Sequence, residues 1–375
     1  MNRPPFNRPL LTRITGKLAI IGLYLAIFIT CLYLPSFLGM FGRKQSINVC
    51  VFSETFAPEA IARFERETGI KVHMTYAEID EQIYAKFRMN GADGYDVVNV
   101  SDYVVHALKD HDLLCPLDKA QLPNSALLDQ RLMGRAYDQE NLFCLPHKWY
   151  VYGLVYDKKF FNEYPQPASL DLIFKDPQVL VDQGLAPSAY RVCMLDDARD
   201  AVCMAGIYLY EKAHGFLPEE FDAIQNLLIA QKRWVEAYTV HSSQYFLTSG
   251  VTPIALMSSN YMHKIYASTE QFDFAVAREG SMLIIENLVI PKMSPKANLA
   301  HKFINFMLSD ENSSYNSAFY GFSSANRTAL AAMVKTAHGE RLLPDISAFK
   351  RLYIPLLPGA LRKRIEDLWL AVSFA

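Results

Sequence analysis

The chain has 375 residues, of which 51% are hydrophobic and 20% charged, so it is long enough for two or three domains with substantial cores. Its 37 Lys and Arg against 39 Asp and Glu give a formal net charge of -2, which argues against a nucleic-acid-binding surface. Because four of the 37 bases and none of the 39 acids lie in residues 1–41, the rest of the chain holds 33 bases and 39 acids. This mildly acidic part weakly favours a cationic partner.

An uncharged apolar stretch covers residues 18–41, LAIIGLYLAIFITCLYLPSFLGMF. At about 1.5 Å per residue, a helix of this length crosses a bilayer. The bases before it predict a cytoplasmic N-terminus and an exported body. A cleaved signal peptide and an uncleaved anchor both fit, and the lack of a small-x-small site near residues 37–42 favours the anchor. We therefore expect residues 1–44 to be a signal peptide or membrane anchor, and the rest to be periplasmic.

The six cysteines form no C-x-x-C pair, so neither a zinc site nor a redox dithiol is expected. An exported body allows disulfides. Cys115 and Cys144 lie in similar short segments, LLCPLD and LFCLPH, that suit neighbours in one domain. A disulfide between them and a set of buried free thiols both remain open.

Strands and helices alternate in the first part of the exported chain. Apolar, β-branched runs predict strands, and amphipathic runs predict helices. The predicted strands are residues 46–52, 70–77 and 95–101, and the predicted helices are residues 57–69, 81–90 and 102–112. This alternation is typical of a parallel sheet with helices on both faces, in which ligands bind outside the carboxyl ends of the strands.

The alternation restarts after LPHKWYVYGLVYD, residues 145–157. Here we predict strands at residues 191–195, 252–258 and 281–292, and helices at residues 197–215, 218–235 and 298–310. The pattern as a whole fits two α/β lobes with a cleft between them.

Three aspartates follow the predicted strand 191–195, in the sequence MLDDARD. Asp196 or Asp197 is placed to cap the next helix, with Asp200 in its first turn. The helix N-terminus also favours ionised carboxylates, and Asp197 and Asp200 share one helix face. These residues alone fit a cap, a metal site or a site for an ammonium group, but a metal needs further ligands that are not seen nearby.

Catalytic signatures are not found in the sequence. No G-x-S-x-G, P-loop, G-x-G-x-x-G or H-E-x-x-H motif occurs, and the nine histidines are scattered. The segment NGADGYD lacks the ligand spacing of a calcium loop. We therefore expect a protein that is not an enzyme and that uses no cofactor and no metal.

From about Ile47 to about Leu330 the sequence resembles the periplasmic spermidine/putrescine-binding proteins of ABC importers. The resemblance is carried by INVCVFSETFAPEAIARFERETGIKV, GYDVVNVSDYVV, LPHKW, LDDARD, REGSMLIIENLVIPK and YGFSSANRTA, in this order. It implies a two-lobed periplasmic binding protein fold with crossing strands at a hinge, whose lobes close on a linear polyamine. It also implies a monomer that delivers its ligand to an ABC permease in the inner membrane.

The resemblance implies lobe boundaries as well. We expect the first α/β lobe to comprise residues 45–152 and 287–330, and the second to comprise residues 153–286 and 331–375.

Binding residues follow from matching positions. In that family acids hold the ammonium groups, which need partners once buried, and aromatic rings cover the methylenes. Asp197 and Asp200 match two such acids, and Glu286 falls where the family carries an aspartate. The other positions that match cleft residues are Phe52, Ser53, Thr55, Ser101, Tyr103, Met257, Ile284 and Phe322.

This chain departs from the family at several of these positions. Phe52, Met257 and Ile284 replace tryptophans, and Thr55 and Phe322 replace tyrosines. The acids are kept while the aromatic box is thinned. We interpret this as weaker binding, as a preference for a shorter diamine or another organic cation, or as loss of binding.

Structural alternatives exist for each residue. Glu286 has Arg278 or Lys292 as possible salt-bridge partners, Ser101 is placed to cap a helix, and the aromatic residues suit core packing. Two alternative functions also fit: a binder of another small organic cation on the same fold, and a membrane-anchored sensor module that no longer serves transport.

Overall fold

The computed structural model describes residues 20–31, 33, 45–164, 168–239, 242–336, 351–355 and 359–375. Two compact units are present, residues 1–46 with 69–71, and residues 47–68 with 72–375. Most of the sheet and every position assigned to a site lie in the larger unit.

In the smaller unit, residues 20–31 are helical and their side chains are exposed. Within the described ranges, no helix combines the length and the apolar character needed to cross a bilayer. Most of the remaining positions of the stretch 18–41 lie outside those ranges. The structure therefore does not confirm the predicted anchor, and the choice between anchor and signal peptide stays a prediction.

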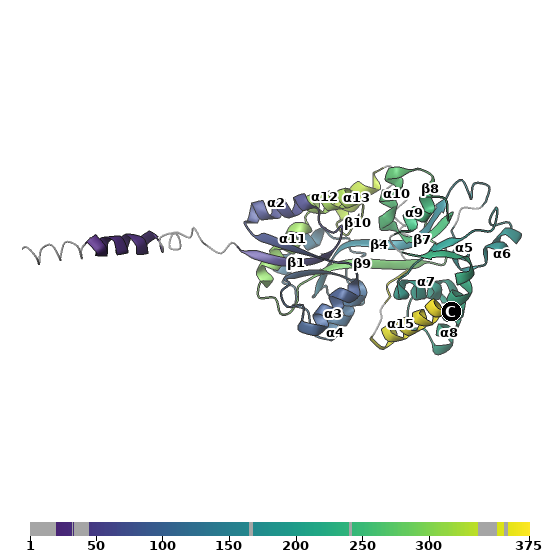
Figure 1. Cartoon of the computed structure of the whole chain (residues 1–375), viewed down its shortest axis with the longest axis horizontal. Coiled ribbons are helices and arrows are strands. Elements are labelled where there is room, and N and C mark those ends of the chain that lie inside the picture. The colour runs from purple at the N-terminus through teal and green to yellow at the C-terminus, as the bar shows by residue number, and fades with distance from the viewer. Residues whose placement is uncertain are drawn as a thin grey trace, which may run out of the picture. The chain divides into compact units, whose positions relative to one another are not determined.

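The strand–helix alternation predicted for the first part of the body is confirmed. Strands β1 (Ser46–Phe52), β2 (Lys71–Ala77) and β3 (Val97–Ser101) alternate with helices α2 (Pro58–Thr68), α3 (Asp80–Asn90) and α4 (Asp102–Asp110). Strands β1 and β3 are parallel, with Val49 opposite Val97. Helix α2 lies on one side of these strands, and α3 and α4 lie on the other (Figure 1). Parallel pairing brings the carboxyl ends of β1 and β3 to the same edge.

Two long strands, β4 (Cys144–Asp157) and β9 (Ser281–Val289), run antiparallel through the middle of the sheet (Figure 1). Nearly all of their residues are buried, which accounts for their apolar sequences. The strand order is β2-β1-β3-β9-β4-β7-β5-β6. Strand β9 therefore pairs with β3 on one side and with β4 on the other.

Beyond β4 the sheet continues with strands that follow it in the sequence. These are β5 (Val192–Met194), β6 (Val235–Tyr238), β7 (Ile254–Ser258) and β8 (Phe272–Ala275). Strand β5 is parallel to β6 and β7, whereas β4 is antiparallel to β7 and β8. Helices α7 (Ala198–Tyr210), α8 (Pro218–Gln231) and the C-terminal α15 (Gly359–Phe374) pack against one another (Figure 1).

Two predicted helices are shorter than the sequence suggested. Helix α7 ends at Tyr210 and not at Gly215, because Glu211 takes a left-handed conformation with φ of 52°. Helix α8 ends at Gln231, and a 3-10 turn then leads into β6, which the sequence analysis missed. In that turn the Trp234 indole donates a hydrogen bond to the carbonyl of Ile173, 3.0 Å away, so a tertiary contact stabilises the change of direction.

Shorter elements form the connections. The helices are α5 (Asp171–Phe174), α6 (Pro177–Asp182), α9 (Ser243–Thr248), α10 (Met262–Ser268), α11 (Ala297–Met307), α12 (Asp310–Tyr320) and α13 (Arg327–Val334). The short strands are β10 (Ser323–Ser324), which pairs with β4, and β11 (Leu352–Tyr353), which pairs with β9.

Among the described residues of the larger unit, two hydrophobic clusters bear on the position of the site. The first core includes Ile83, Phe87, Val98, Val104 and Leu108, and the second core includes Met194, Ile207, Ile224, Leu228 and Leu368. Strand β4 contributes Cys144 to the first core and Leu154 to the second, and β9 contributes Val289 and Ile284 in the same way. Strands β4 and β9 thus contribute residues to both cores. The lobe boundaries given by the sequence analysis stay a prediction.

All six cysteines are free thiols. The Cys115–Cys144 disulfide that the sequence left open is not formed. Burial raises the pKa of the Cys144 thiol well above its usual range, as expected for a small packed side chain.

Candidate functional site

Ser101, Glu286 and Lys148 form one row across three neighbouring strands. Ser101 of β3 is paired with Glu286 of β9, and Glu286 is paired with Lys148 of β4. Lys148 is in turn paired with Ser324 of β10. Directly opposed residues of a sheet present their side chains on the same face. The row therefore brings two predicted site residues next to a lysine that the sequence analysis did not single out.

Glu286 and Lys148 form a buried ion pair. The Lys148 Nζ lies 3.1 Å from Oε1 of Glu286, and their side chains are only 7% and 6% exposed. Burial raises the pKa of the Glu286 carboxyl, and the Lys148 ammonium opposes that shift. The same ammonium lies 5.5 Å from the ring centroid of Phe322. Lys148 thus contacts both an acid and an aromatic ring that were assigned to a ligand, and the expected partners Arg278 and Lys292 are not the ones used.

The two acids of the MLDDARD motif have different roles. Asp197 is the N-cap of α7, and its Oδ1 accepts a hydrogen bond from the backbone N–H of Asp200 at 2.9 Å. Asp200 is buried, accepts a hydrogen bond from the Nε of Arg199 at 2.6 Å, and also accepts one from the Tyr152 hydroxyl. Burial raises the pKa of Asp200 to about 6, although Arg199 opposes the shift. The capping prediction is confirmed, and the carboxylate of Asp200 is already paired within the protein.

Arg199 also covers the predicted aromatic face of Tyr103. Its guanidinium carbon lies 4.2 Å from the Tyr103 ring centroid, within the range of a cation–π contact. A second arginine, Arg362 of α15, lies 5.5 Å from the same ring. The Tyr103 hydroxyl donates to Glu81 at 2.9 Å. Tyr103 is therefore buried in contacts that come from elements of both cores.

Two further buried acids, Asp80 and Asp102, lie beside these residues. Asp80 accepts hydrogen bonds from the backbone N–H of Ser101 at 3.0 Å and from its hydroxyl at 2.5 Å. Ser101 occupies the N-cap position of α4, but its hydroxyl makes this bond in place of a cap. Asp102 accepts from the backbone N–H of Ile285 at 2.9 Å and of Tyr103 at 2.7 Å. Burial raises the pKa of both carboxyls to about 7, with Arg199 opposing.

We call these six residues the acid cluster: Asp80, Asp102, Asp200, Glu286, Arg199 and Lys148. Tyr150 lies among them, and burial together with the charges of Glu286 and Asp200 raises its pKa well above the usual value. The four acids face two bases, so a negative charge is left over unless protons or a cation balance it. Across the described ranges, no group of three or more His, Cys, Asp or Glu side chains has the arrangement of a metal site.

The other predicted positions lie at varied depths. Phe52 is half-buried at the end of β1, Ser53 is exposed, and Thr55 is buried with its hydroxyl donating to the carbonyl of Phe52 at 2.8 Å. Met257 and Ile284 are fully buried, and Ile284 belongs to the second core. Their assignment to ligand contacts stays a prediction.

His147, next to Lys148, adds a neutral group. Its ring lies between Phe56, at 4.8 Å, and Phe322, at 5.5 Å between centroids. Burial lowers its pKa to about 3, and the neighbouring Lys148 charge acts in the same direction. The His147 ring is therefore neutral at physiological pH and adds no positive charge that would repel the Lys148 ammonium.

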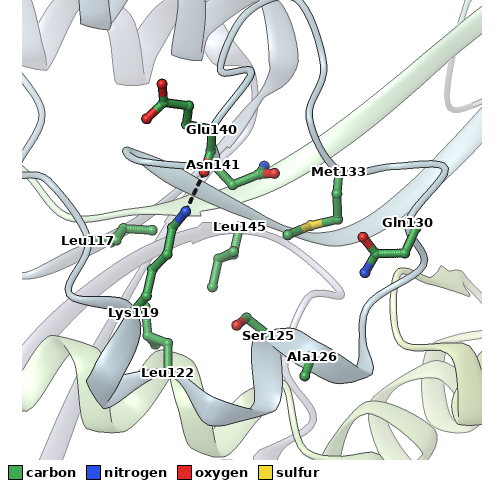
Figure 2. Close-up of a pocket in the computed structure, with 10 residues that line it drawn as sticks. All are labelled: Leu117, Lys119, Leu122, Ser125, Ala126, Gln130, Met133, Glu140, Asn141 and Leu145. Atoms are coloured by element: carbon green, nitrogen blue, oxygen red, sulfur yellow. Dashed lines mark hydrogen bonds between the residues drawn. The ribbon is translucent and has the colours of Figure 1, made fainter.

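Two cavities lie apart from the acid cluster. One of about 260 Å³ is lined by residues between Leu117 and Leu145, where the Lys119 side chain points toward Glu140 and donates to its carbonyl at 2.7 Å (Figure 2). The other, of about 330 Å³, lies between α10 and the helices α12 and α13, and includes His263 and Met333. The residues lining these two cavities include none of the acid cluster.

The sequence analysis missed the roles of Lys148, Arg199, Asp80 and Asp102. A signal for Lys148 was present: it is the lone charge in the apolar run from Cys144 to Tyr156, as Glu286 is in the run of β9. Lone opposite charges on two buried strands indicate a pair, because a charge is seldom buried without one. Asp80 and Asp102 look like ordinary acids at helix starts, and only the tertiary packing buries them.

Comparison with known proteins places these features in a family. A family model described as bacterial extracellular solute-binding protein matches residues 59–340. The putrescine/cadaverine-binding protein of Pseudomonas aeruginosa is 30% identical over 335 residues, which are 86% of this chain and 92% of the relative. The putrescine-binding periplasmic protein PotF of Escherichia coli is 25% identical over 301 residues, 76% of this chain and 80% of the relative.

Solved structures share the fold. A Listeria monocytogenes protein named for spermidine/putrescine ABC transport superposes with a TM-score of 0.77 at 25% identity, covering 88% of this chain and 99% of that one. A spermidine/putrescine ABC transporter substrate-binding protein of Streptococcus pneumoniae gives a TM-score of 0.75 at 23% identity, with coverage of 88% and 99%. The resemblance seen in the sequence is thereby confirmed.

Proposed function

The chain belongs to the bacterial extracellular solute-binding protein family, and from this premise we propose that it is the solute-binding component of an ABC importer for aliphatic amines of the putrescine and spermidine class. The observation that carries the proposal is the excess of buried acids over buried bases in the acid cluster. A ligand ammonium group supplies positive charge and three hydrogen-bond donors. No chemical conversion is required, since this family and fold are those of transport components.

Asp197 is the acid best placed to receive a ligand ammonium group. Its side chain is 33% exposed and lies 3.8 Å from the Nε of Arg199, whereas that of Asp200 is 3% exposed and lies 2.6 Å from the same nitrogen. Phe52, half-buried at the end of β1, is then a candidate to cover ligand methylenes.

Relatives named for putrescine, cadaverine and spermidine support an amine ligand. A specific observation favours a second candidate, another small organic cation. The faces of Tyr103 and Phe322 are already approached by the protein's own cations, so less aromatic surface is left for an alkyl chain. Native mass spectrometry of freshly purified protein distinguishes the two by the mass of a retained molecule.

Titration calorimetry of the full chain with putrescine, cadaverine, spermidine and spermine tests the proposal, with thermal shift as a second readout. We expect saturable heat and a raised melting temperature for at least one of the four. The absence of both at millimolar ligand would rule out amine recognition of this class.

We further propose that the body acts in the periplasm and delivers its ligand to an inner-membrane permease. Several relatives are named as periplasmic proteins. Alkaline phosphatase fused after residue 375 reports export, and sequencing the N-terminus of the mature protein shows whether residues 18–41 are removed. A retained segment would keep the membrane-anchored sensor alternative open, whereas an inactive fusion would contradict export.

A further inference from the structure

Lys148 occupies a position suited to a cationic group of a ligand. Its ammonium lies 3.1 Å from Oε1 of Glu286 and 5.5 Å from the ring centroid of Phe322. An acid on one side and an aromatic face on the other is the environment that stabilises an alkylammonium ion. Here the protein supplies that ion itself.

Lys148 is not free to leave this position. Its backbone is held in the sheet between β9 and β10, where it is paired with Glu286 and Ser324. Its side chain is 7% exposed. Displacing its ammonium from Glu286 would leave a charge buried without a counterion, which is strongly unfavourable. A ligand ammonium group therefore does not replace Lys148 at Glu286.

The remaining acids accept few additional charges. Asp200 is paired with Arg199 at 2.6 Å. Asp80 and Asp102 receive hydrogen bonds from Ser101, Tyr103 and Ile285. Asp197 is 33% exposed and its Oδ1 lies 3.8 Å from the Nε of Arg199, so it is more accessible to a ligand than Asp200, which is 3% exposed.

We propose that Lys148 takes the place of one ligand ammonium group, so that the site selects small amines with one or two cationic centres and disfavours triamines and tetraamines. This inference rests on the proposed amine-binding function. It assigns to Lys148 the role of a specificity-determining residue that lowers the positive charge the site accepts by one. A third or fourth ammonium group would approach the Lys148 charge without a free acid to receive it.

The experiment measures the ratio of dissociation constants for spermidine and n-butylamine, by calorimetry on the full chain. In the unchanged protein we expect spermidine to gain no more over n-butylamine than putrescine does, because the site accepts at most two cationic centres. K148M frees Glu286, so spermidine affinity should rise at least about tenfold relative to n-butylamine. The matched control is K292M, which removes the exposed Lys292–Asp112 pair elsewhere in the protein and should leave the ratio unchanged.

The double variant K148M/E286Q identifies the source of the gain. It removes both charges of the pair, so the ratio should return to that of the unchanged protein. If K148M does not fold, E286Q gives the answer: the unpaired Lys148 charge should then weaken spermidine more than n-butylamine, and equal weakening would overturn the inference.

The outcomes separate the two proposals. If the unchanged protein binds amines and K148M has the same ratio of dissociation constants for spermidine and n-butylamine, the role of Lys148 is overturned. The proposed function then still stands. Spermidine binding only in K148M supports the role of Lys148 and contradicts polyamine capture by the unchanged protein. A gain that persists in K148M/E286Q also overturns the inference, because it would not depend on Glu286.

Discussion

Arg199 of α7 stacks on Tyr103 of α4, with its guanidinium carbon 4.2 Å from the ring centroid, while its Nε donates to Asp200 at 2.6 Å. Tyr103 belongs to the first core and α7 packs in the second. One side chain therefore joins elements of both cores and neutralises a buried acid. The DDARD motif supplies the counterion as well as the helix cap.

Removing the Arg199 charge should destabilise the protein. R199M leaves Asp200 buried without its counterion, so we expect the free energy of unfolding to fall by about 3 kcal/mol. In the control R191M, the Arg191–Glu236 pair is lost from a largely exposed position, at a cost of at most about 1 kcal/mol. Urea denaturation of both variants gives the comparison. Equal losses would contradict the structural role of Arg199.

The pH dependence of stability should report the buried acids. The pKa of Asp80 is raised from 3.8 to about 7 in the folded protein, so the folded state binds more protons than the unfolded state between these values. The neutral carboxyl of Asp80 therefore contributes its full stabilisation to the folded state below pH 3.8. This contribution declines as pH rises toward 7, because the carboxyl must then ionise in a buried place. Between pH 5 and 8 this decline is on the order of 2 kcal/mol.

The variant D80N isolates that contribution. It should flatten the fall in stability between pH 5 and pH 8, measured by urea denaturation at several pH values. His147, whose pKa is lowered to about 3, acts in the opposite direction at low pH, but it is present in both proteins and cancels in the comparison. Identical pH profiles for the two proteins would show that Asp80 does not titrate in this range.

Amine binding should strengthen from pH 5 to pH 8. At low pH the carboxyls of Asp200, with a pKa of about 6, and Asp102, with a pKa of about 7, are protonated and the cluster has less negative charge to offer. A bound ammonium group lowers these pKa values, so binding releases protons. Calorimetry in two buffers with different ionisation enthalpies measures the number released. Uptake of protons, or affinity that does not depend on pH, would contradict this view of the cluster.

The C-terminal helix α15 should stabilise the second core. Leu368 is buried in that core with 5% of its surface exposed, whereas Leu370 on the same helix is 53% exposed. L368A should lower the free energy of unfolding by about 2–5 kcal/mol through loss of packing. L370A should change it by no more than about 0.5 kcal/mol. Thermal or urea denaturation of the pair shows whether the helix is docked in solution.

Local sequence patterns predicted most elements of the fold because their periodicity reports burial directly. Strands β1 and β2 and the helices α2 to α4 lie where hydrophobic spacing put them, and the failure at β6 arose where Trp234 makes a tertiary contact. The motif and the resemblance singled out Asp197, Asp200 and Glu286, whose binding role stays a prediction. Asp80, Asp102 and the partners of Asp200 and Glu286 were missed. Arg278 and Lys292 were considered for Glu286 because they are near in sequence, whereas the register of β4 against β9 selected Lys148.

The sharing of β4 and β9 constrains how this protein can be divided. A break in the backbone between Cys144 and Leu154 would deprive each half of a strand that its own interior needs. Neither fragment should then persist alone, and heating should melt the intact molecule in one transition. For the same reason, a split reporter built from this protein should be divided in a surface loop and not within β4 or β9.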